Sequence, residues 1–274
     1  MPEKPARPRS RAPEKPAGSR AAASSNAARA RPRPRAAKGK TAFARWLTQY
    51  LDDSRRWDVA VLLTAPLFAL YELCLLLLTR GEIRNAADVR LKEWMLSVHQ
   101  HLPLVVNTLL LLGFIAAAIW REKRPHVPWL APAMILESFA WAFVLGPITL
   151  LFMRGMPLLA TASGGGAILE VAFGVGAGLY EELLFRLMIV GGLSWLLTRF
   201  GKFPPWFALG APVVFGAALF ALFHHVGPLG DPMEPRLVAF RIVAGLILGT
   251  IFVTRGFTVA VWTHALYDVM LALD

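Results

Sequence analysis

Ionisable side chains lie inside long apolar stretches of this sequence, where a charge has a high energetic cost. A charged residue at the centre of a membrane span costs about 2.5–3.5 kcal/mol on insertion-based scales. Such residues are candidates for function, although hydrogen bonding between helices is the common structural reason for them. They are Glu72, Glu137, Glu170, Glu181, Glu182, Arg186, His224, His225, Arg241, His264 and Asp268. Glu72 and Glu137 stand alone, and we interpret both as structural. Glu170 and Arg241 lie near the ends of apolar stretches, where interfacial water can solvate them.

The segment from Tyr180 to Arg186, with the sequence YEELLFR, offers one paired and one unpaired carboxylate. At 100° per residue, Arg186 lies about 40° from Glu182 on a helix, so that the two form an i,i+4 pair. Glu181 points in another direction. The pattern predicts that Arg186 neutralises Glu182 while Glu181 stays free to face a cavity. An ion-pair cluster at a helix end is the alternative.

Two histidine motifs follow on later apolar stretches. In Phe220-Ala-Leu-Phe-His224 the phenyl ring and the imidazole share one helix face, whereas the adjacent His225 suits an interfacial role. In His264-Ala-Leu-Tyr-Asp268 the i,i+4 spacing lets the carboxylate orient the imidazole and set its tautomer, with a purely structural His–Asp bond as the alternative. We expect the unpaired glutamate and both motifs to converge on one site, because burying each charge separately would cost several kcal/mol.

The elements that must position these residues are membrane helices. The chain has 274 residues, of which 56% are hydrophobic, and a mean hydropathy of +0.50, which excludes a water-soluble globule. We therefore predict an all-α polytopic membrane bundle of seven or eight transmembrane helices. Its spans are the seven apolar stretches Val59–Leu78, Leu104–Trp120, Trp129–Met153, Ala167–Thr198, Trp206–Phe223, Leu237–Val253 and Phe257–Leu273.

The fourth stretch, Ala167–Thr198, is too long for one upright span. Its 32 residues make about 48 Å of helix, against a hydrocarbon core of about 30 Å. We expect it to tilt strongly, to turn back, or to break after Arg186 or at Gly191-Gly192, and a break would add the eighth helix. The run Gly174–Gly178 within it indicates either an unwound helix or close helix packing.

A basic tail precedes the apolar part of the chain. Residues 1–40 hold seven prolines and 12 of the 29 Lys and Arg residues, with only Glu3 and Glu14 opposing them. This composition predicts a disordered tail over residues 1–42 that contacts anionic lipid headgroups, and no specific nucleic-acid partner. We divide the rest into N-terminal membrane helices, 43–160, and a motif-bearing helix bundle, 161–274. The single cysteine, Cys74, excludes an intramolecular disulfide framework.

Positive charges near the helix ends indicate the orientation. The tail, and the Arg121, Lys123 and Arg124 that follow the second apolar stretch, place the N-terminus in the cytoplasm. The loop 79–101 argues against this, because its four basic residues would then lie outside: they are Arg80, Arg84, Arg90 and Lys92. On balance we expect an N-terminus inside.

The three motifs, in this order on three apolar stretches, resemble the CAAX-processing and bacteriocin-processing (CPBP) family of intramembrane endopeptidases, the type II CAAX proteases. Members carry E-E-x-x-x-R, F-x-x-x-H and H-x-x-x-N/D. The resemblance covers roughly residues 165–270. It implies hydrolysis of a peptide bond near the end of a membrane-associated protein or peptide, and a location in a bacterial inner membrane. Nothing in the sequence encodes a prenyl pocket, so the substrate stays open.

The resemblance also implies a role for each motif residue. Glu181 is the general base that activates water, and His224 helps to hold that water. His264 and Asp268 stabilise the oxyanion. The supporting pair is Glu182 and Arg186. Many family members have asparagine at the last position, and an ionised carboxylate cannot donate a hydrogen bond. Asp268 is therefore either protonated in its apolar site or acts indirectly by orienting His264, and we favour the indirect role.

A metal ion is the main mechanistic alternative. Glu181, His224 and His264 have the donor types of a His₂Glu zinc site with an open position. We favour a mechanism in which a glutamate activates water without a metal or other cofactor.

Other classes of membrane protein fit the sequence less well. An H-E-x-x-H zinc motif is absent, no serine has a recognisable nucleophile setting, and the aspartates occur in the wrong order for an aspartyl intramembrane protease. A transporter is disfavoured because no inverted repeat is apparent. An inactive scaffold is the stronger competitor, and the complete motif set argues against it.

Overall fold

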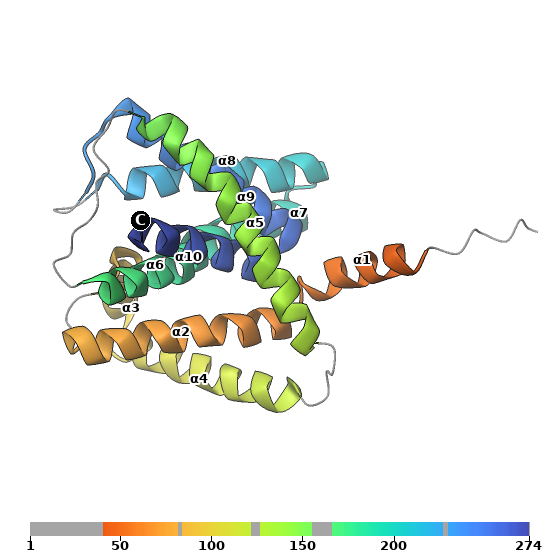
Figure 1. Ribbon diagram of the computed structural model, residues 1–274, viewed down its shortest axis with the longest axis horizontal. Coiled ribbons are helices and arrows are strands. Elements are labelled where there is room, and N and C mark those ends of the chain that lie inside the picture. The colour runs from red at the N-terminus through yellow and green to blue at the C-terminus, as the bar shows by residue number, and fades with distance from the viewer. Residues whose placement is uncertain (1–40, 82–83, 122–126, 155–165, 227–229, 274) are drawn as a thin grey trace, which may run out of the picture. The chain divides into compact units, whose positions relative to one another are not determined.

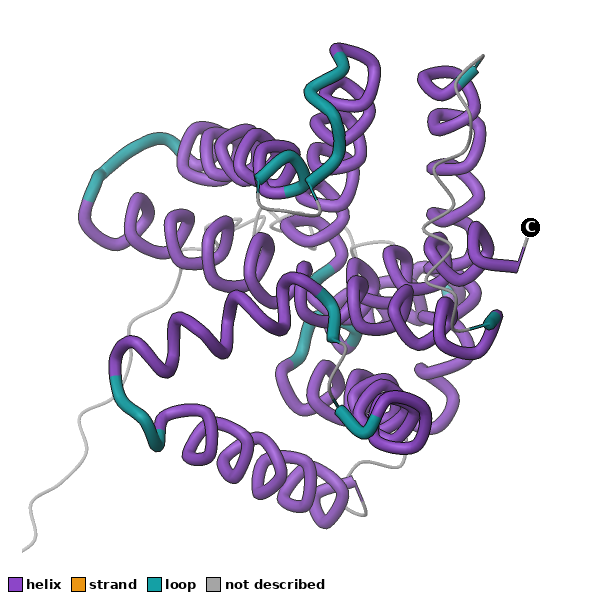
Figure 2. Tube along the Cα trace, turned by 90° about the vertical axis from the view of Figure 1, so that its left-hand side faces the viewer, coloured by secondary structure: helices purple, strands orange, loops and turns teal. Residues whose placement is uncertain are grey.

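The computed structural model describes residues 41–81, 84–121, 127–154, 166–226 and 230–273. This part is helical and contains no strand (Figures 1 and 2). The predicted tail lies outside the described residues as far as residue 40. The helices are α1 (Ala42–Asp53), α2 (Trp57–Thr79), α3 (Ala86–Val98), α4 (Leu102–Arg121), α5 (Val127–Met153), α6 (Ala167–Glu181), η1 (Glu182–Gly191), α7 (Gly192–Phe200), α8 (Pro205–Phe223), α9 (Pro235–Arg255) and α10 (Phe257–Leu273).

Five helices of the described part are long and apolar enough to cross a membrane. They are α2, Trp129–Thr149 of α5, the continuous helix Ala167–Phe200, α8 and α9. Two further apolar helices, Leu102–Ala116 of α4 and α10, are shorter. The 17 residues of α10 make about 26 Å of helix, less than the hydrocarbon core of about 30 Å. The protein is an integral membrane protein whose described residues hold five candidate spans, so the predicted count of seven or eight is not confirmed.

The long fourth stretch does not break. From Ala167 to Phe200 the backbone stays helical, and Glu182–Gly191 in its middle is a π-helix. The predicted break after Arg186 or at Gly191-Gly192 is wrong, because the chain keeps its backbone hydrogen bonds by changing to i→i+5 pairing. Giving up those bonds in lipid would cost several kcal/mol each. π-Helical turns are rare and occur often at functional sites.

Glycines let α6 approach two helices closely. A Cβ placed on Gly178 would lie 2.5 Å from the backbone nitrogen of Ala265 in α10, and one on Gly176 would lie 2.2 Å from the ring of Tyr71 in α2. A Cβ on Gly174 would meet that of Asp268 at 3.0 Å. The run is therefore close packing within an intact helix, and the packing places α10 beside the end of α6 (Figure 1).

The helix α8 packs between η1 and α9. Gly216 of α8 faces Val190 of η1, where a Cβ would approach the valine side chain to 2.6 Å. Gly245 of α9 faces Ala217, with a Cβ only 2.9 Å from its Cα. Proline opens both α8 and α9 at the first helical position, where its missing N–H costs nothing. The close contacts at Gly216 and Gly245 hold the end of α8 near η1.

Glu137 ties α1, α5 and α9 together, which agrees with its structural interpretation. Arg255 of α9 donates two hydrogen bonds to this carboxylate, at 2.6 and 2.8 Å. Tyr50 of α1 donates a third hydrogen bond to it through its hydroxyl group. Burial, and then the hydrogen bond to Glu137, raise the pKa of Tyr50 far above its usual range, so the phenol stays protonated as the donor.

Candidate active site

The candidate catalytic residues come from helices that meet around the start of η1. Glu181 is the last residue of α6 and Glu182 the first of η1. His224 directly follows α8, while His264 and Asp268 lie one turn apart in α10. Contacts of 2.8 to 3.9 Å join these five side chains into one cluster.

Glu182 holds a buried arginine and a buried histidine. Its side chain is fully buried, and its Oε1 lies 3.1 Å from Nη1 of Arg186 and 2.8 Å from Nδ1 of His264. The predicted ion pair with Arg186 is therefore present. The Asp268 carboxylate lies 3.4 Å from Nε2 of His264. The prediction that Asp268 orients this ring is thus incomplete, because Glu182 makes the shorter contact at the other nitrogen.

Glu181 is the carboxylate without a close partner. It is 5% exposed, and its Oε2 has no hydrogen-bond partner. The Nε2 atoms of His224 and His264 face this oxygen at 3.6 and 3.9 Å. Both distances exceed a direct hydrogen bond. Two adjacent glutamates thus have different environments, as the helical spacing predicts.

Phe220 explains the spacing of the second motif. Its ring packs against the imidazoles of His224 and His264, with ring centroids 4.7 and 6.0 Å apart. The guanidinium carbon of Arg186 lies 4.4 Å from the centre of the same ring. A phenylalanine one turn before the histidine therefore contacts all three motifs, and it covers the buried arginine with an aromatic face.

The His224 ring has a defined tautomer. Its Nδ1 lies 2.8 Å from the carbonyl oxygen of Phe220, one turn earlier on α8. A carbonyl oxygen only accepts, so Nδ1 carries the proton. In the neutral ring Nε2 is then an acceptor, and this is the nitrogen that faces Glu181.

Arg241 and Asp231 belong to the surroundings of the site, although Arg241 was expected only to be solvated near the end of an apolar stretch and Asp231 was not a candidate. Nη2 of Arg241 donates to Oδ2 of Asp231 at 2.9 Å. The backbone N–H of Asp231 donates to the carbonyl of His224 at 2.8 Å, and its own carbonyl lies 3.0 Å from Nδ1 of His225. Arg241 also interacts electrostatically with Glu181. Periodicity could not find this pair, because Asp231 lies outside any helix.

The donor types around Glu181 suit zinc, but their spacing is wide. Neighbouring ligands of a tetrahedral zinc ion lie about 3.4 Å apart, given bonds of about 2.1 Å. The separations from Glu181 to His224 and His264 are 3.6 and 3.9 Å. Within the described ranges, no group of three or more His, Cys, Asp or Glu side chains meets the geometry of a metal site.

A comparison with protein families agrees with the resemblance of the motifs. Residues 164–270 match the family model of the Rce1-like type II CAAX prenyl endopeptidases. The match begins just before α6, ends within α10 and takes in all three motifs. No significant match to a curated protein or to a solved structure was found. The C-terminal part of this integral membrane protein is therefore similar to the Rce1-like type II CAAX prenyl endopeptidases, a family of proteases.

Proposed function

We propose that the protein is an intramembrane endopeptidase that cleaves a peptide bond near the end of a membrane-associated protein or peptide. The proposal is carried by Oε2 of Glu181, which is buried, lacks a hydrogen-bond partner and faces Nε2 of both His224 and His264. A water molecule between Glu181 and His224 would donate one hydrogen bond to each, because both atoms accept. Its oxygen lone pairs would then point at the substrate carbonyl.

The proposed reaction uses these positions in two steps. Glu181 removes a proton from the water as its oxygen attacks the carbonyl carbon, which gives a tetrahedral intermediate with an oxyanion. The intermediate collapses, the C–N bond breaks, and the proton on Glu181 moves to the leaving amine. General acid–base catalysis of this kind contributes about 10²–10⁴-fold.

His264 is placed to stabilise the oxyanion. Glu182 accepts from its Nδ1, so a protonated ring presents an Nε2–H group toward Glu181 and Asp268. One such donor contributes about 10²–10³-fold to hydrolysis. Asp268 acts through His264, because a carboxylate favours the charged imidazole and cannot itself donate. Arg186 keeps Glu182 in place.

Zinc is the alternative way to activate the water. Glu181, His224 and His264 would hold the ion, and it would polarise the substrate carbonyl and acidify the bound water. We favour the metal-free mechanism, in which the histidines and Glu181 act directly.

The cellular setting is also a proposal. We place the protein in a bacterial inner membrane with its N-terminus in the cytoplasm, where residues 1–40 meet anionic headgroups. A catalytically inactive scaffold would keep the buried ion pairs but would need no unpaired glutamate. A transporter would need a path for its substrate, and intramembrane charges alone do not supply one.

The first prediction separates the two glutamates. Glu181→Gln keeps size and hydrogen bonding but cannot take a proton, so cleavage should fall by at least about 10²-fold while the folded yield stays normal. Glu182→Gln leaves Arg186 and His264 without their carboxylate, so folded yield and activity should fall together. Comparative proteomics of membrane-protein C-termini, in cells with the wild type or Glu181→Ala, identifies substrates for the assay.

Glu170→Gln is the matched control, because this glutamate lies in the first turn of the same helix, away from the cluster. It should retain wild-type cleavage and yield. Identical C-termini in wild-type and Glu181→Ala cells would refute the protease proposal. Equal yields with equal residual activity for the Glu181 and Glu182 variants would refute the division of roles.

A further inference from the structure

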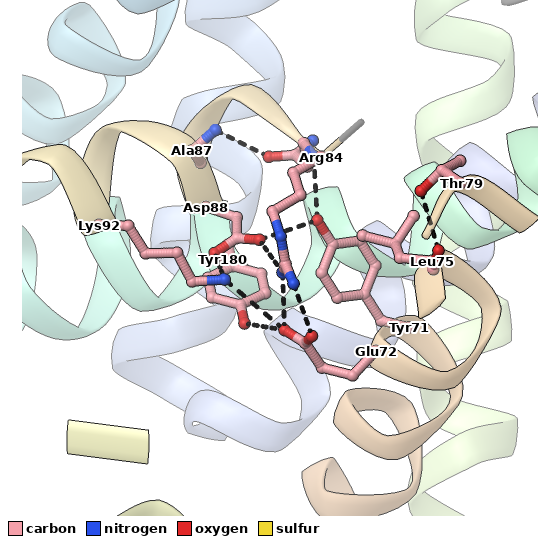
Figure 3. Close-up of polar contacts among 10 residues, drawn as sticks. Tyr71, Glu72, Leu75, Thr79, Arg84, Ala87, Asp88, Lys92 and Tyr180 are labelled. Carbon is pink, nitrogen blue, oxygen red and sulfur yellow. Dashed lines mark hydrogen bonds and ion pairs between the residues drawn. The ribbon is translucent and has the colours of Figure 1, made fainter. Parts of the chain in front are cut away.

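A second cluster of charges lies between α2, α3 and α6, with Asp88 buried and the three other charged side chains partly exposed (Figure 3). Arg84 donates two hydrogen bonds to Glu72, at 3.0 and 3.1 Å, and one to Asp88 at 2.8 Å. Lys92 pairs with the other oxygen of Asp88 at 2.7 Å. Asp88 is fully buried, and it also accepts from the hydroxyl of Tyr71 at 3.1 Å. Each charge of the cluster has an ion-pair partner within it. One of its carboxylates, Glu72, also contacts α6.

The contact on α6 is Tyr180, the residue before the proposed base. Its hydroxyl donates to Oε1 of Glu72 at 3.1 Å (Figure 3). Its ring packs on that of Tyr71, with centroids 5.4 Å apart, and Lys92 lies 5.9 Å from its centre. The side chain is 6% exposed. Two helices therefore hold one residue of α6 by both its ring and its hydroxyl group.

The position of Tyr180 along the chain gives this contact its meaning. Glu181 follows it directly, and the helix changes from α to π at Glu182. The direction of the Glu181 side chain thus depends on how α6 is rotated in its last turn. Oε2 of Glu181 accepts no hydrogen bond that could fix that direction. Tyr180, the residue directly before Glu181, is held in place by contacts that lie outside the site.

We infer that Tyr180 is a positioning residue for Glu181, and that the Glu72–Arg84–Asp88 cluster exists to hold it. This inference rests on the proposed function, since it concerns the base of that reaction. Loss of the Tyr180 hydroxyl lets the end of α6 rotate, so that the Glu181 carboxylate moves relative to His224 and the attacking water. A displacement of about 1 Å in an active site can cost about 10²-fold in rate.

A matched cluster elsewhere separates positioning from plain stability. In the cluster of α1, α5 and α9, Tyr50 donates to Glu137, which Arg255 holds with two hydrogen bonds. Tyr50 is 7% exposed, almost the same as Tyr180, but its cluster does not include a residue of α6 or η1. The two tyrosines differ in what they touch and not in chemistry.

The test compares Tyr180→Phe with Tyr50→Phe in the full chain, using a substrate from the proteomic comparison. We expect kcat of Tyr180→Phe to fall about tenfold or more, with KM near that of the wild type. Tyr50→Phe should lower the unfolding temperature by a similar amount and leave kcat unchanged. Glu72→Gln keeps an acceptor for Tyr180 and should retain more kcat than Glu72→Leu. Wild-type kcat in Tyr180→Phe, or an equal loss in Tyr50→Phe, would overturn the inference.

A second measurement does not need catalysis. In a Cys74→Ser background, Glu181→Cys with His224→Cys should crosslink efficiently with short bifunctional thiol reagents, because the native side chains approach to 3.6 Å. Adding Tyr180→Phe should reduce the yield severalfold, and adding Tyr50→Phe should not. An unchanged yield would overturn the inference. If the crosslinking yields change as expected but the wild-type protein cleaves no substrate, the proposed function is wrong and the inference about Tyr180 is not.

Discussion

Partners, and not residue type, separate the two adjacent glutamates. Arg186 and His264 both lie within about hydrogen-bonding distance of Glu182, whereas Oε2 of Glu181 faces two imidazoles beyond that distance. A carboxylate that is already paired with fixed cations is a poor base. A carboxylate that is buried without such bonds can take a proton at lower cost. The same difference predicts that Glu181→Gln loses cleavage activity, whereas Glu182→Gln also loses folded yield.

Asp268 offers a direct test of how the third motif works. Asp268→Asn places an amide donor 3.4 Å or so from the His264 nitrogen, where it can bond to an oxyanion directly. We expect this variant to keep activity within about tenfold of the wild type, since one hydrogen-bond contribution replaces another. Asp268→Leu supplies neither a charge nor a donor, and kcat should fall by about 10²-fold. Steady-state kinetics on the same substrate checks both, and equal activity of the two variants would contradict the role.

The dependence of cleavage on a metal ion concerns Glu181, His224 and His264. If Glu181 activates water directly, cleavage by detergent-purified protein should persist after exhaustive chelation, and metal analysis should find well below about one equivalent. A zinc site would lose activity to a strong chelator and regain it on zinc addition. That result would make His224 and His264 ligands, and it would leave the protease proposal in place.

At the scale of elements, small residues decide which helices meet. α6 approaches α10 through Gly174 and Gly178 and approaches α2 through Gly176. These contacts bring His264 to Glu182 and Tyr71 to Tyr180, so one glycine-rich turn sets up both the site and its support. Side chains at these positions would separate the helices, because packed interiors do not yield by an ångström without cost.

Gly178→Ala tests this dependence. The new methyl would lie 2.5 Å from a backbone nitrogen of α10, and such overpacking costs about 1–3 kcal/mol. We expect a lower unfolding temperature and at least about tenfold less cleavage, because His264 moves away from Glu181. Gly192→Ala is the control, since nothing lies within 4 Å of its Cβ position. Wild-type stability for Gly178→Ala would show that α6 and α10 can adjust freely.

Sequence periodicity predicted helices but could not predict their registers. The i,i+4 rule found the Glu182–Arg186 pair and placed Glu181 apart, because both follow from a local helix. It could not find that Glu182 also binds His264, 82 positions away, since that contact depends on how α6 packs on α10. The π-helix was missed for a related reason: glycines at 191 and 192 indicate a break in water, while lipid penalises exposed backbone groups.

The whole molecule carries its charge unevenly. The formal net charge is +11, and the first 40 residues hold most of the excess, with 12 basic and two acidic residues. The basic residues of the segment between α2 and α4 are largely neutralised. Arg84 and Lys92 pair with Glu72 and Asp88, and Arg90 pairs with Glu93. The segment that argued against a cytoplasmic N-terminus thus presents less net charge than its basic residues suggest.

Orientation can be measured on the intact protein. Trypsin cuts after Lys and Arg, so the tail, with its 12 such residues, should be digested only from the side it occupies. With an N-terminal epitope, we expect loss of the epitope in inverted inner-membrane vesicles and its protection in spheroplasts, because basic segments stay on the cytoplasmic side. Detergent should allow digestion in both preparations, which controls for protection by folding. Digestion in spheroplasts but not in inverted vesicles would show the opposite orientation. The loop before α3, together with its charge cluster, would then lie in the cytoplasm.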